Sequence, residues 1–116
     1  MKPSRGDVVL VLFPDSNLRT AKRRPALVVQ ADNLQTGLAQ TIVAMITSNL
    51  ARAGHPARVP VSLNTTEGQR SGLKADSIIM TDNLATILQN EIDRVIGSWM
   101  AMDAVDAALR KTLGLS

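Results

Sequence analysis

The chain has 116 residues, 45% of them hydrophobic, which is enough for one domain with an apolar core and too apolar for a disordered protein. It contains no cysteine and one histidine, so a disulfide framework and thiolate metal ligands are excluded, and no metal or cofactor is expected. No apolar run approaches the roughly 20 residues of a membrane helix, and no signal peptide precedes the first strand. We therefore expect a single domain over residues 1–116 in the cytoplasm, with no membrane contact.

The net charge of +3 is unevenly distributed along the chain. Residues 1–58 contain eight lysines and arginines and three acids, whereas residues 59–116 contain five and seven. A basic half that faces outward would attract a polyanion such as a nucleic acid, although such clusters are also common on ordinary solvated surfaces.

The first half of the chain alternates apolar strands with polar loops. A strand is expected over Asp7–Phe13, where an apolar run ends at a group of turn-forming residues. The polar and basic segment Pro14–Arg24 is expected to be a loop, and loops of this length in a compact domain are usually functional. A second strand is expected over Pro25–Gln30, with proline at its first position, and a third over Gln40–Thr47.

The second half contains shorter strands. After a polar loop over Ser48–Ala57, an edge strand is expected over Arg58–Leu63, because its proline cannot donate a ladder hydrogen bond. A turn-rich segment, two strand pieces, a helical turn and a last strand are expected in that order over Asn64–Lys74, Asp76–Asp82, Ala85–Leu88, Asn90–Asp93 and Arg94–Ser98.

The end of the chain has the pattern of an amphipathic helix. Ser98 is placed to cap its N-terminus, Asp103 lies early, where negative charge is favoured, and Gly114 stands where the helix should end. One face carries apolar residues at three- and four-residue spacing, namely Met102, Val105, Leu109 and Leu113. Many short strands and one helix predict a mostly β fold of the α+β type, a small β-barrel closed by a C-terminal helix.

Polar side chains stand at the ends of two of these apolar strands. Arg23 and Arg24 precede the strand that begins at Pro25, and the strand over Gln40–Thr47 is followed by Ser48. Guanidinium and hydroxyl groups on one rim of a barrel can form an anion site, and phosphate is the anion we expect there.

Nine short segments together carry a family resemblance: Arg5–Val11, Arg24–Val29, Ile46–Ser48, Ser71–Leu73, Asp76–Ile79, Asp82, Thr86–Ile87, Arg94–Gly97 and Leu113–Leu115. In order and spacing they resemble the MazF/PemK family of toxin endoribonucleases over almost the whole chain. The resemblance implies an SH3-like β-barrel of the MazF/CcdB type with a C-terminal helix. It also implies a homodimer that cleaves single-stranded RNA without a metal as the toxin of a type II toxin–antitoxin system. A small acidic antitoxin would silence it, and operator DNA would be contacted only through that antitoxin.

The resemblance also implies which residues act on the RNA. Residues of MazF-type members match Arg24 and Thr47 here, with Ser48 beside them. In such cleavage the ribose 2′-OH attacks the adjacent phosphate and leaves a 2′,3′-cyclic phosphate and a 5′-OH end, so the protein must hold and neutralise the phosphate. A planar guanidinium binds two phosphate oxygens at once, and a hydroxyl can donate to another. We therefore expect Arg24 and Thr47 to be catalytic, with substrate binding by Ser48, Arg23, Asn17, Arg19, Lys22 and Arg58. The substrate expected from the resemblance is messenger RNA, although the residues do not distinguish it from transfer or ribosomal RNA.

The proton acceptor is left open, because arginine stays protonated at any accessible pH. Histidine is the side chain best suited to move protons near neutral pH, but a lone loop histidine such as His55, after the third strand, is more often an ordinary surface residue. PemK-type relatives place an arginine two residues before Asp82, where this chain has Met80, so Asp82 is expected to cap a turn. Trp99 and Phe13 are expected in the core or a dimer interface rather than stacked on bases.

The candidate site residues also have structural interpretations. Arg24 would then be an ion-paired strand end, Thr47 a strand terminus, and Arg19, Lys22 and Arg23 part of a solvated loop. Two other functions remain open: a family member that binds nucleic acid or antitoxin without cutting, and a gyrase-targeting toxin. The second fits poorly, because gyrase poisons such as CcdB act through a C-terminal tryptophan that this chain lacks.

Overall fold

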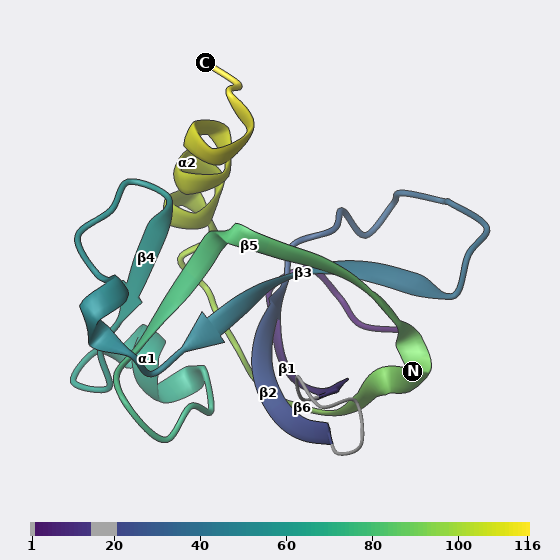
Figure 1. Ribbon diagram of the computed structural model, residues 1–116, viewed down its shortest axis with the longest axis horizontal. Helices are drawn as coiled ribbons and strands as arrows, with labels where there is room; N and C mark the ends of the chain where they lie inside the picture. The colour runs from purple at the N-terminus through teal and green to yellow at the C-terminus, as the bar shows by residue number, and fades with distance from the viewer. Residues whose placement is uncertain (1, 15–20) are drawn as a thin grey trace.

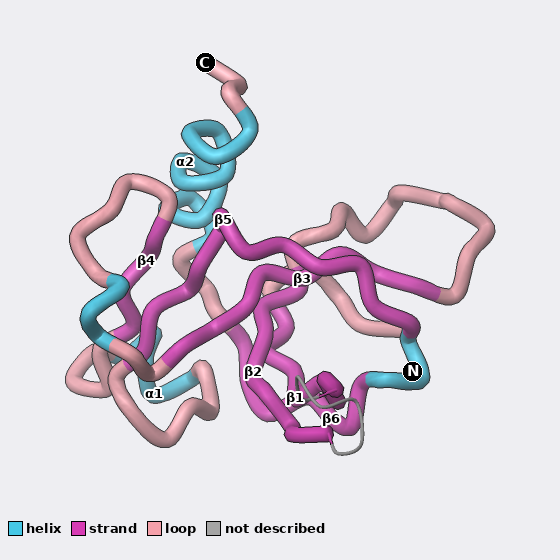
Figure 2. Tube along the Cα trace, in the orientation of Figure 1, coloured by secondary structure: helices cyan, strands magenta, loops and turns pink. Residues whose placement is uncertain are grey.

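The computed structural model describes residues 2–14 and 21–116, and six antiparallel strands form its framework (Figures 1 and 2). The strands are β1 (Asp7–Pro14), β2 (Ala21–Val28), β3 (Gln40–Thr47), β4 (Arg58–Val61), β5 (Ser77–Leu88) and β6 (Ile92–Ser98). They lie in one sheet in the order β4-β5-β3-β2-β1-β6. The predicted mostly β fold is confirmed, with the barrel left open, over the residues described, between its edge strands β4 and β6.

In the described part of the chain, four helical segments accompany the sheet: η1 (Leu50–Arg52), α1 (Thr66–Arg70), η2 (Gln89–Glu91) and α2 (Met102–Leu113). α2 packs against β4 and β5 and carries the C-terminus away from the sheet (Figure 1). Within the described ranges, no helix has the length and apolar character needed to cross a membrane.

Two apolar clusters occupy the two faces of the sheet. The helix-side cluster includes Val8, Leu27, Ile79, Trp99 and Val105, so it joins the strands to α2. The strand cluster consists of Val9, Val11, Ala26, Val28, Val43, Ile87 and Ile92, which come from five strands of the curved sheet. Because side chains alternate between faces, a strand buried on both sides is apolar at nearly every position. This explains the continuous apolar run in β1.

β2 begins at Ala21, earlier than the predicted start at Pro25. Lys22 and Arg24 pair in register with Phe13 and Val11 of β1, so the last part of the predicted loop is strand. Strand pairing uses backbone groups, so charged side chains can occupy a strand wherever they face solvent. For this reason the charge of residues 22–24 did not indicate a strand. β3 has the predicted bounds, and β4 lies at a sheet edge as its proline indicated.

β5 is one strand rather than the two predicted pieces, and it contains a bulge. Met45 of β3 pairs with Met80, but the preceding residue Ala44 pairs with Leu84. Thr81, Asp82 and Asn83 therefore have no partner in β3 and form the bulge. The prediction that Asp82 caps a turn is wrong, because a polar triplet inside a strand has the same composition as a turn.

Two glycines allow the segment after α1 to lie directly on β6. A Cβ built on Gly97 would overlap the backbone of Arg70 and Ser71, and one on Gly72 would overlap the carbonyl of Ile96. The buried Ser71 hydroxyl donates to the Gly68 carbonyl at 2.5 Å. Two of the segments in the family resemblance, Ser71–Leu73 and Arg94–Gly97, thus form this backbone contact.

α2 begins later than the sequence suggested. Ser98 belongs to β6, and Ala101 occupies the N-cap without a side-chain hydrogen bond, so the predicted serine cap is wrong. Between β6 and α2, Trp99 is buried in the core, and its indole Nε1 donates to the Ala101 carbonyl at 3.2 Å. The predicted end is confirmed, since Gly114 adopts the left-handed conformation (φ +71°) that glycine accepts without strain.

Candidate functional site

The register of β2 and β3 brings Arg24 and Thr47 to the same place. Ala26 pairs with Met45 and Val28 with Val43, and the same register continued outward sets Arg24 opposite Thr47. Pro25 lacks the N–H that would extend the ladder to this position. By alternation, Arg24 and Thr47 project from the sheet face that carries the strand cluster, at its rim.

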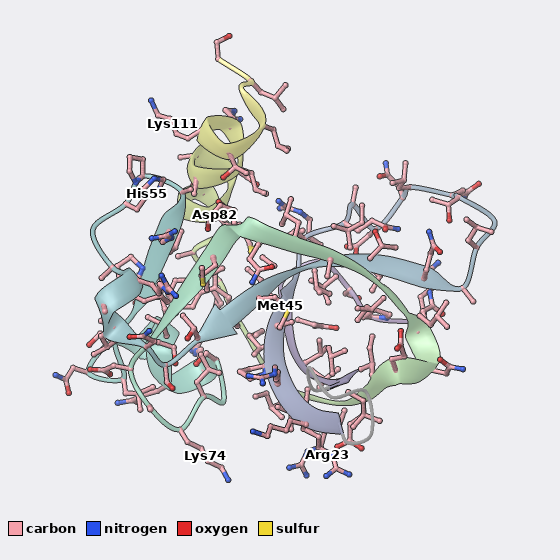
Figure 3. All side chains as sticks on the ribbon, in the orientation of Figure 1. Arg23, Met45, His55, Lys74, Asp82 and Lys111 are labelled. Atoms are coloured by element: carbon pink, nitrogen blue, oxygen red, sulfur yellow. The ribbon has the colours of Figure 1, made fainter. Side chains whose placement is uncertain are left out.

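Two grooves meet at this pair of residues. The Met45 groove, of about 490 Å³, is lined by the apolar residues Met45, Met80 and Ala85 and by the polar residues Arg24, Thr47, Asn49, Arg52 and Asn83. The Lys74 groove, of about 340 Å³, contains Arg24 and Thr47 again, together with Arg23, Ser48, Lys74 and Ser77. Met45 and Lys74 are labelled in Figure 3 and mark the two grooves. The predicted convergence of Arg24 and Thr47 is therefore present in the structure, while their catalytic roles stay a prediction.

Both grooves are electrically positive. Arg24 and Arg52 line the Met45 groove, and Arg23, Arg24 and Lys74 line the Lys74 groove. Among the described residues, no aspartate or glutamate lines either one. A concave surface with charges of one sign concentrates the potential and attracts ligands of the opposite sign. The site thus suits a chain of phosphates.

The hydroxyl of Thr47 is oriented by the turn that follows β3. The Asn49 backbone N–H donates to Thr47 Oγ1 at 3.1 Å, and the Ala51 N–H donates to Asn49 Oδ1, also at 3.1 Å. Asn49 is thereby the N-cap of η1. Because Thr47 Oγ1 accepts in this contact, its own proton is available for a phosphate oxygen. The same turn leads the chain back so that Arg52 reaches the Met45 groove.

Arg23 and Lys22 occupy exposed positions on β2 beside Arg24. Arg23 Nε lies 3.1 Å from Asp93 Oδ2, and its side chain is 60% exposed. An ion pair this exposed contributes little to stability and is easily exchanged for a phosphate. Arg23 lines only the Lys74 groove, as does Ser48. Asn17 and Arg19, also predicted to bind substrate, lie outside the described residues.

Arg58 is engaged by protein groups and lines neither groove. Its Nη2 and Nε donate to Asp82 Oδ2 and Oδ1 at 2.9 and 3.4 Å, and its Nη1 donates to the Arg52 carbonyl at 3.2 Å. Hydrogen bonding from Arg58 lowers the pKa of Asp82 from its ordinary value of 3.8. The placement does not support direct substrate contact by Arg58.

His55 is exposed and lies on the loop that leads into β4, away from Met45 and close to Asp82 in the view of Figure 3. The Ala57 N–H donates to its Nδ1 at 3.1 Å, so a neutral imidazole carries its proton on Nε2. His55 lines neither groove. The geometry therefore gives no support to His55 as the proton acceptor.

The groove residues that were not foreseen include the polar side chains of Asn49, Arg52, Lys74 and Asn83. The Asn49 cap followed by a basic residue three positions later would have indicated Arg52. Asn83 depends on the bulge in β5, and Lys74 on the packing of the segment after α1, and neither has a local signature. Over residues 2–14 and 21–116, no group of three metal-ligating side chains is found.

Comparison with known proteins assigns the family. The family described as "PemK-like, MazF-like toxin of type II toxin-antitoxin system" matches residues 4–113 of this chain. Endoribonuclease MazF6 of Mycobacterium tuberculosis is 36% identical over 107 residues, covering 90% of each chain, and endoribonuclease EndoA of Bacillus subtilis is 32% identical over 114 residues, covering 96% of this chain and 94% of EndoA. A solved mycobacterial endoribonuclease in complex with its cognate antitoxin shares the fold with a TM-score of 0.76 at 22% identity, covering 98% and 97% of the two chains. The chain therefore belongs to the PemK-like, MazF-like toxins of type II toxin–antitoxin systems, the family of these endoribonucleases.

Proposed function

We propose that this endoribonuclease toxin cuts single-stranded messenger RNA without a metal ion and leaves a 2′,3′-cyclic phosphate and a 5′-OH end. The observation that carries the proposal is the position of Arg24 and Thr47, which line both positively charged grooves. An RNA chain that follows the two grooves passes over Arg24 and Thr47. One phosphate therefore contacts these residues, and the nucleotides on either side of it lie in the two grooves.

The chemistry follows from the groups at this junction. The guanidinium of Arg24 binds two non-bridging oxygens of the scissile phosphate, and the Thr47 hydroxyl donates to one of them. Both interactions strengthen as negative charge builds on these oxygens in the transition state. The 2′-oxygen forms a bond to phosphorus as the bond to the 5′-oxygen breaks. One proton leaves the 2′-OH and one reaches the 5′-oxygen.

Proton transfer is the weaker part of the machinery. Arg24 is a poor base because it holds its proton at any accessible pH. Positioned acid–base groups usually contribute about 10²–10⁴ in rate, so an enzyme that relies on electrostatic stabilisation alone turns over slowly by comparison. Slow turnover is sufficient for a toxin that acts by removing messages.

The proposed partners are an acidic antitoxin and a second copy of the chain. An acidic peptide segment in the Lys74 groove would neutralise Arg23, Arg24 and Lys74 and block access of RNA, and the solved relative with its cognate antitoxin supports such a partner. Operator DNA would be bound only through the antitoxin. The free toxin would act as a homodimer in the cytoplasm.

The test is cleavage of one long single-stranded RNA followed by mapping of the ends. We expect Arg24→Ala to abolish cleavage while its circular dichroism and melting curve match the wild type, and Arg94→Ala, which removes an exposed arginine of β6, to cut normally. Cleavage should proceed fully in excess EDTA and yield 5′-OH ends. An Arg24→Ala variant that cuts at the wild-type rate, or activity that needs added Mg²⁺, would refute the proposal.

A further inference from the structure

We propose that Arg52 is a second phosphate contact of this site and that the Arg58–Asp82 ion pair is the positioning device that holds it in the Met45 groove. The inference rests on the proposed function, because it assumes that the grooves bind RNA. It assigns Arg58 an indirect role in place of the direct substrate contact expected from the sequence.

Arg52 stands on a loop that apolar packing does not hold. Residues 48–56, between β3 and β4, are all exposed, and η1 buries none of its residues. Segments with few buried apolar contacts open at low free-energy cost. Polar contacts must therefore fix the place at which the Arg52 side chain enters the groove.

Arg58 provides those contacts with all three of its guanidinium nitrogens. Two of them form a fork on the Asp82 carboxylate, and the third donates to the backbone carbonyl of Arg52 itself. The side chains of Arg58 and Asp82 are 21% and 30% exposed, so solvent screens the pair only partly. Bidentate pairs of this kind fix orientation as well as distance. The Arg58 side chain thus connects the carbonyl of Arg52 to the bulge of β5.

The bulge is the rigid side of this connection. Thr81, next to Asp82, is fully buried, and its hydroxyl donates to the Ala57 carbonyl at 2.6 Å. That contact uses the only proton of the hydroxyl, so Thr112 of α2 is the donor in the 2.9 Å contact with Thr81 Oγ1. Asp82 is consequently anchored through β5 to the helix, and it is the loop that the ion pair restrains.

The ion pair positions two residues that line the Met45 groove. It holds Arg52 through the contact with the Arg52 carbonyl, and it holds Asn83 because this residue comes directly after Asp82 in the bulge. Together with Arg24 of β2, Arg52 gives the Met45 groove two guanidinium groups that can bind one RNA chain. Two phosphates of a strand are the ligands such a pair fits.

Binding of an uncleavable RNA, one with a 2′-O-methyl group at a mapped cut site, tests the inference at several salt concentrations. Each phosphate contact of a single strand contributes roughly 0.7 to the slope of log K against log salt, so Arg52→Gln should lower the slope by about that amount. Its affinity should fall roughly tenfold. Arg58→Lys, which keeps the charge but not the fork, and Asp82→Asn should reproduce both effects, and neither should add to Arg52→Gln in the double variants.

Asp82→Asn gives the sharpest result, because two explanations predict opposite signs. Removing a carboxylate near a basic groove strengthens RNA binding if only the overall field matters. Under the inference, binding weakens because Arg52 is released. Asp103→Asn, an exposed acid of α2, makes the same change in net charge and is the matched control. Melting curves establish that every variant is folded.

Two outcomes would overturn the inference. One is RNA binding by Asp82→Asn as tight as that of Asp103→Asn, and the other is an unchanged salt slope for Arg52→Gln. Failure of the proposed function gives a different pattern, since Arg24→Ala would then still cut RNA whatever the binding assays show for Arg52. Steady-state kinetics add an independent readout: loss of a binding contact should raise KM more than it lowers kcat.

Discussion

Arg5 and Asp106, which are 101 positions apart, form an ion pair with 2.5 Å between Nη2 and Oδ1. The same guanidinium donates through Nε to the Val29 carbonyl at 2.9 Å, and the Arg5 backbone N–H donates to Asp32 at 2.6 Å. Arg5 therefore connects the start of the chain to the end of β2 and to α2. Although it belongs to the basic half of the sequence, its role in the structure is to hold the fold together.

We expect Arg5→Met to lower the free energy of unfolding by about 1–3 kcal/mol, because it leaves the Asp106 carboxylate and the Val29 carbonyl without their charged donor. Urea denaturation at fixed protein concentration measures this, since association would otherwise shift the midpoint. Lys111→Met, an exposed cation in the last turn of α2, is the control and should change stability by less than about 1 kcal/mol. Equal midpoints for the two variants would contradict the role of Arg5.

Gly97→Ala is expected to be more damaging than its size suggests. The added Cβ would overlap backbone atoms of Arg70 and Ser71, which cannot rotate away as a side chain could. We expect a loss of about 1–3 kcal/mol or a shift of the segment after α1, with the thermal midpoint as the measurement. Ser98→Ala, at the next and exposed position of β6, should melt close to the wild type. Normal melting of Gly97→Ala would show that β6 can move away from this segment.

The parts of the site that follow from strand ends were predictable from the sequence, and the parts that follow from the bulge were not. Arg24 and Thr47 adjoin apolar strands whose antiparallel pairing brings their ends together, so the convergence needs only local patterns. The sequence placed Arg58 at the substrate. Its pairing with Asp82, 24 positions away, could not be foreseen, because the bulge in β5 positions Asp82. A bulge in one strand depends on the twist and packing of its neighbours, and no short sequence pattern fixes it.

The Arg58–Asp82 pair should make the free energy of unfolding depend on pH in the acidic range. Because the folded-state pKa of Asp82 lies below its ordinary value, the pair stabilises the fold above the unfolded pKa. That contribution is complete above about pH 5 and is lost as the pH falls through 3.8 and then through the lower folded value. The difference in urea midpoint between wild type and Asp82→Asn should therefore shrink from pH 7 to pH 3. A difference that stays constant would mean that the carboxylate does not titrate with folding.

Substitution of Thr47 separates its hydroxyl from its role as a strand end. Thr47→Val keeps the β-branched shape but removes the proton donor, and loss of one donor to a developing oxyanion costs roughly 10²–10³ in kcat. Thr47→Ser keeps the hydroxyl and the acceptor for the Asn49 N–H, so it should retain most of the activity. Initial rates on one RNA with a mapped cut site give the comparison. If valine and serine variants cut equally well, the hydroxyl has no part in the reaction.

Arg24→Lys tests whether geometry or charge matters at the scissile phosphate. A lysine ammonium restores the positive charge but binds as a point, whereas the guanidinium presents two parallel N–H groups to two phosphate oxygens. Because Arg24 is exposed on the rim, the change should leave melting unaltered. We expect RNA affinity to stay within a few-fold of the wild type while kcat falls by roughly 10² or more, since the lost bond strengthens in the transition state. Binding assays and single-turnover cleavage on the same RNA separate the two quantities. Near-normal kcat in Arg24→Lys would mean that Arg24 serves only to attract the RNA, and the search for the group that stabilises the phosphorane would then move to Arg52 and Asn83 in the Met45 groove.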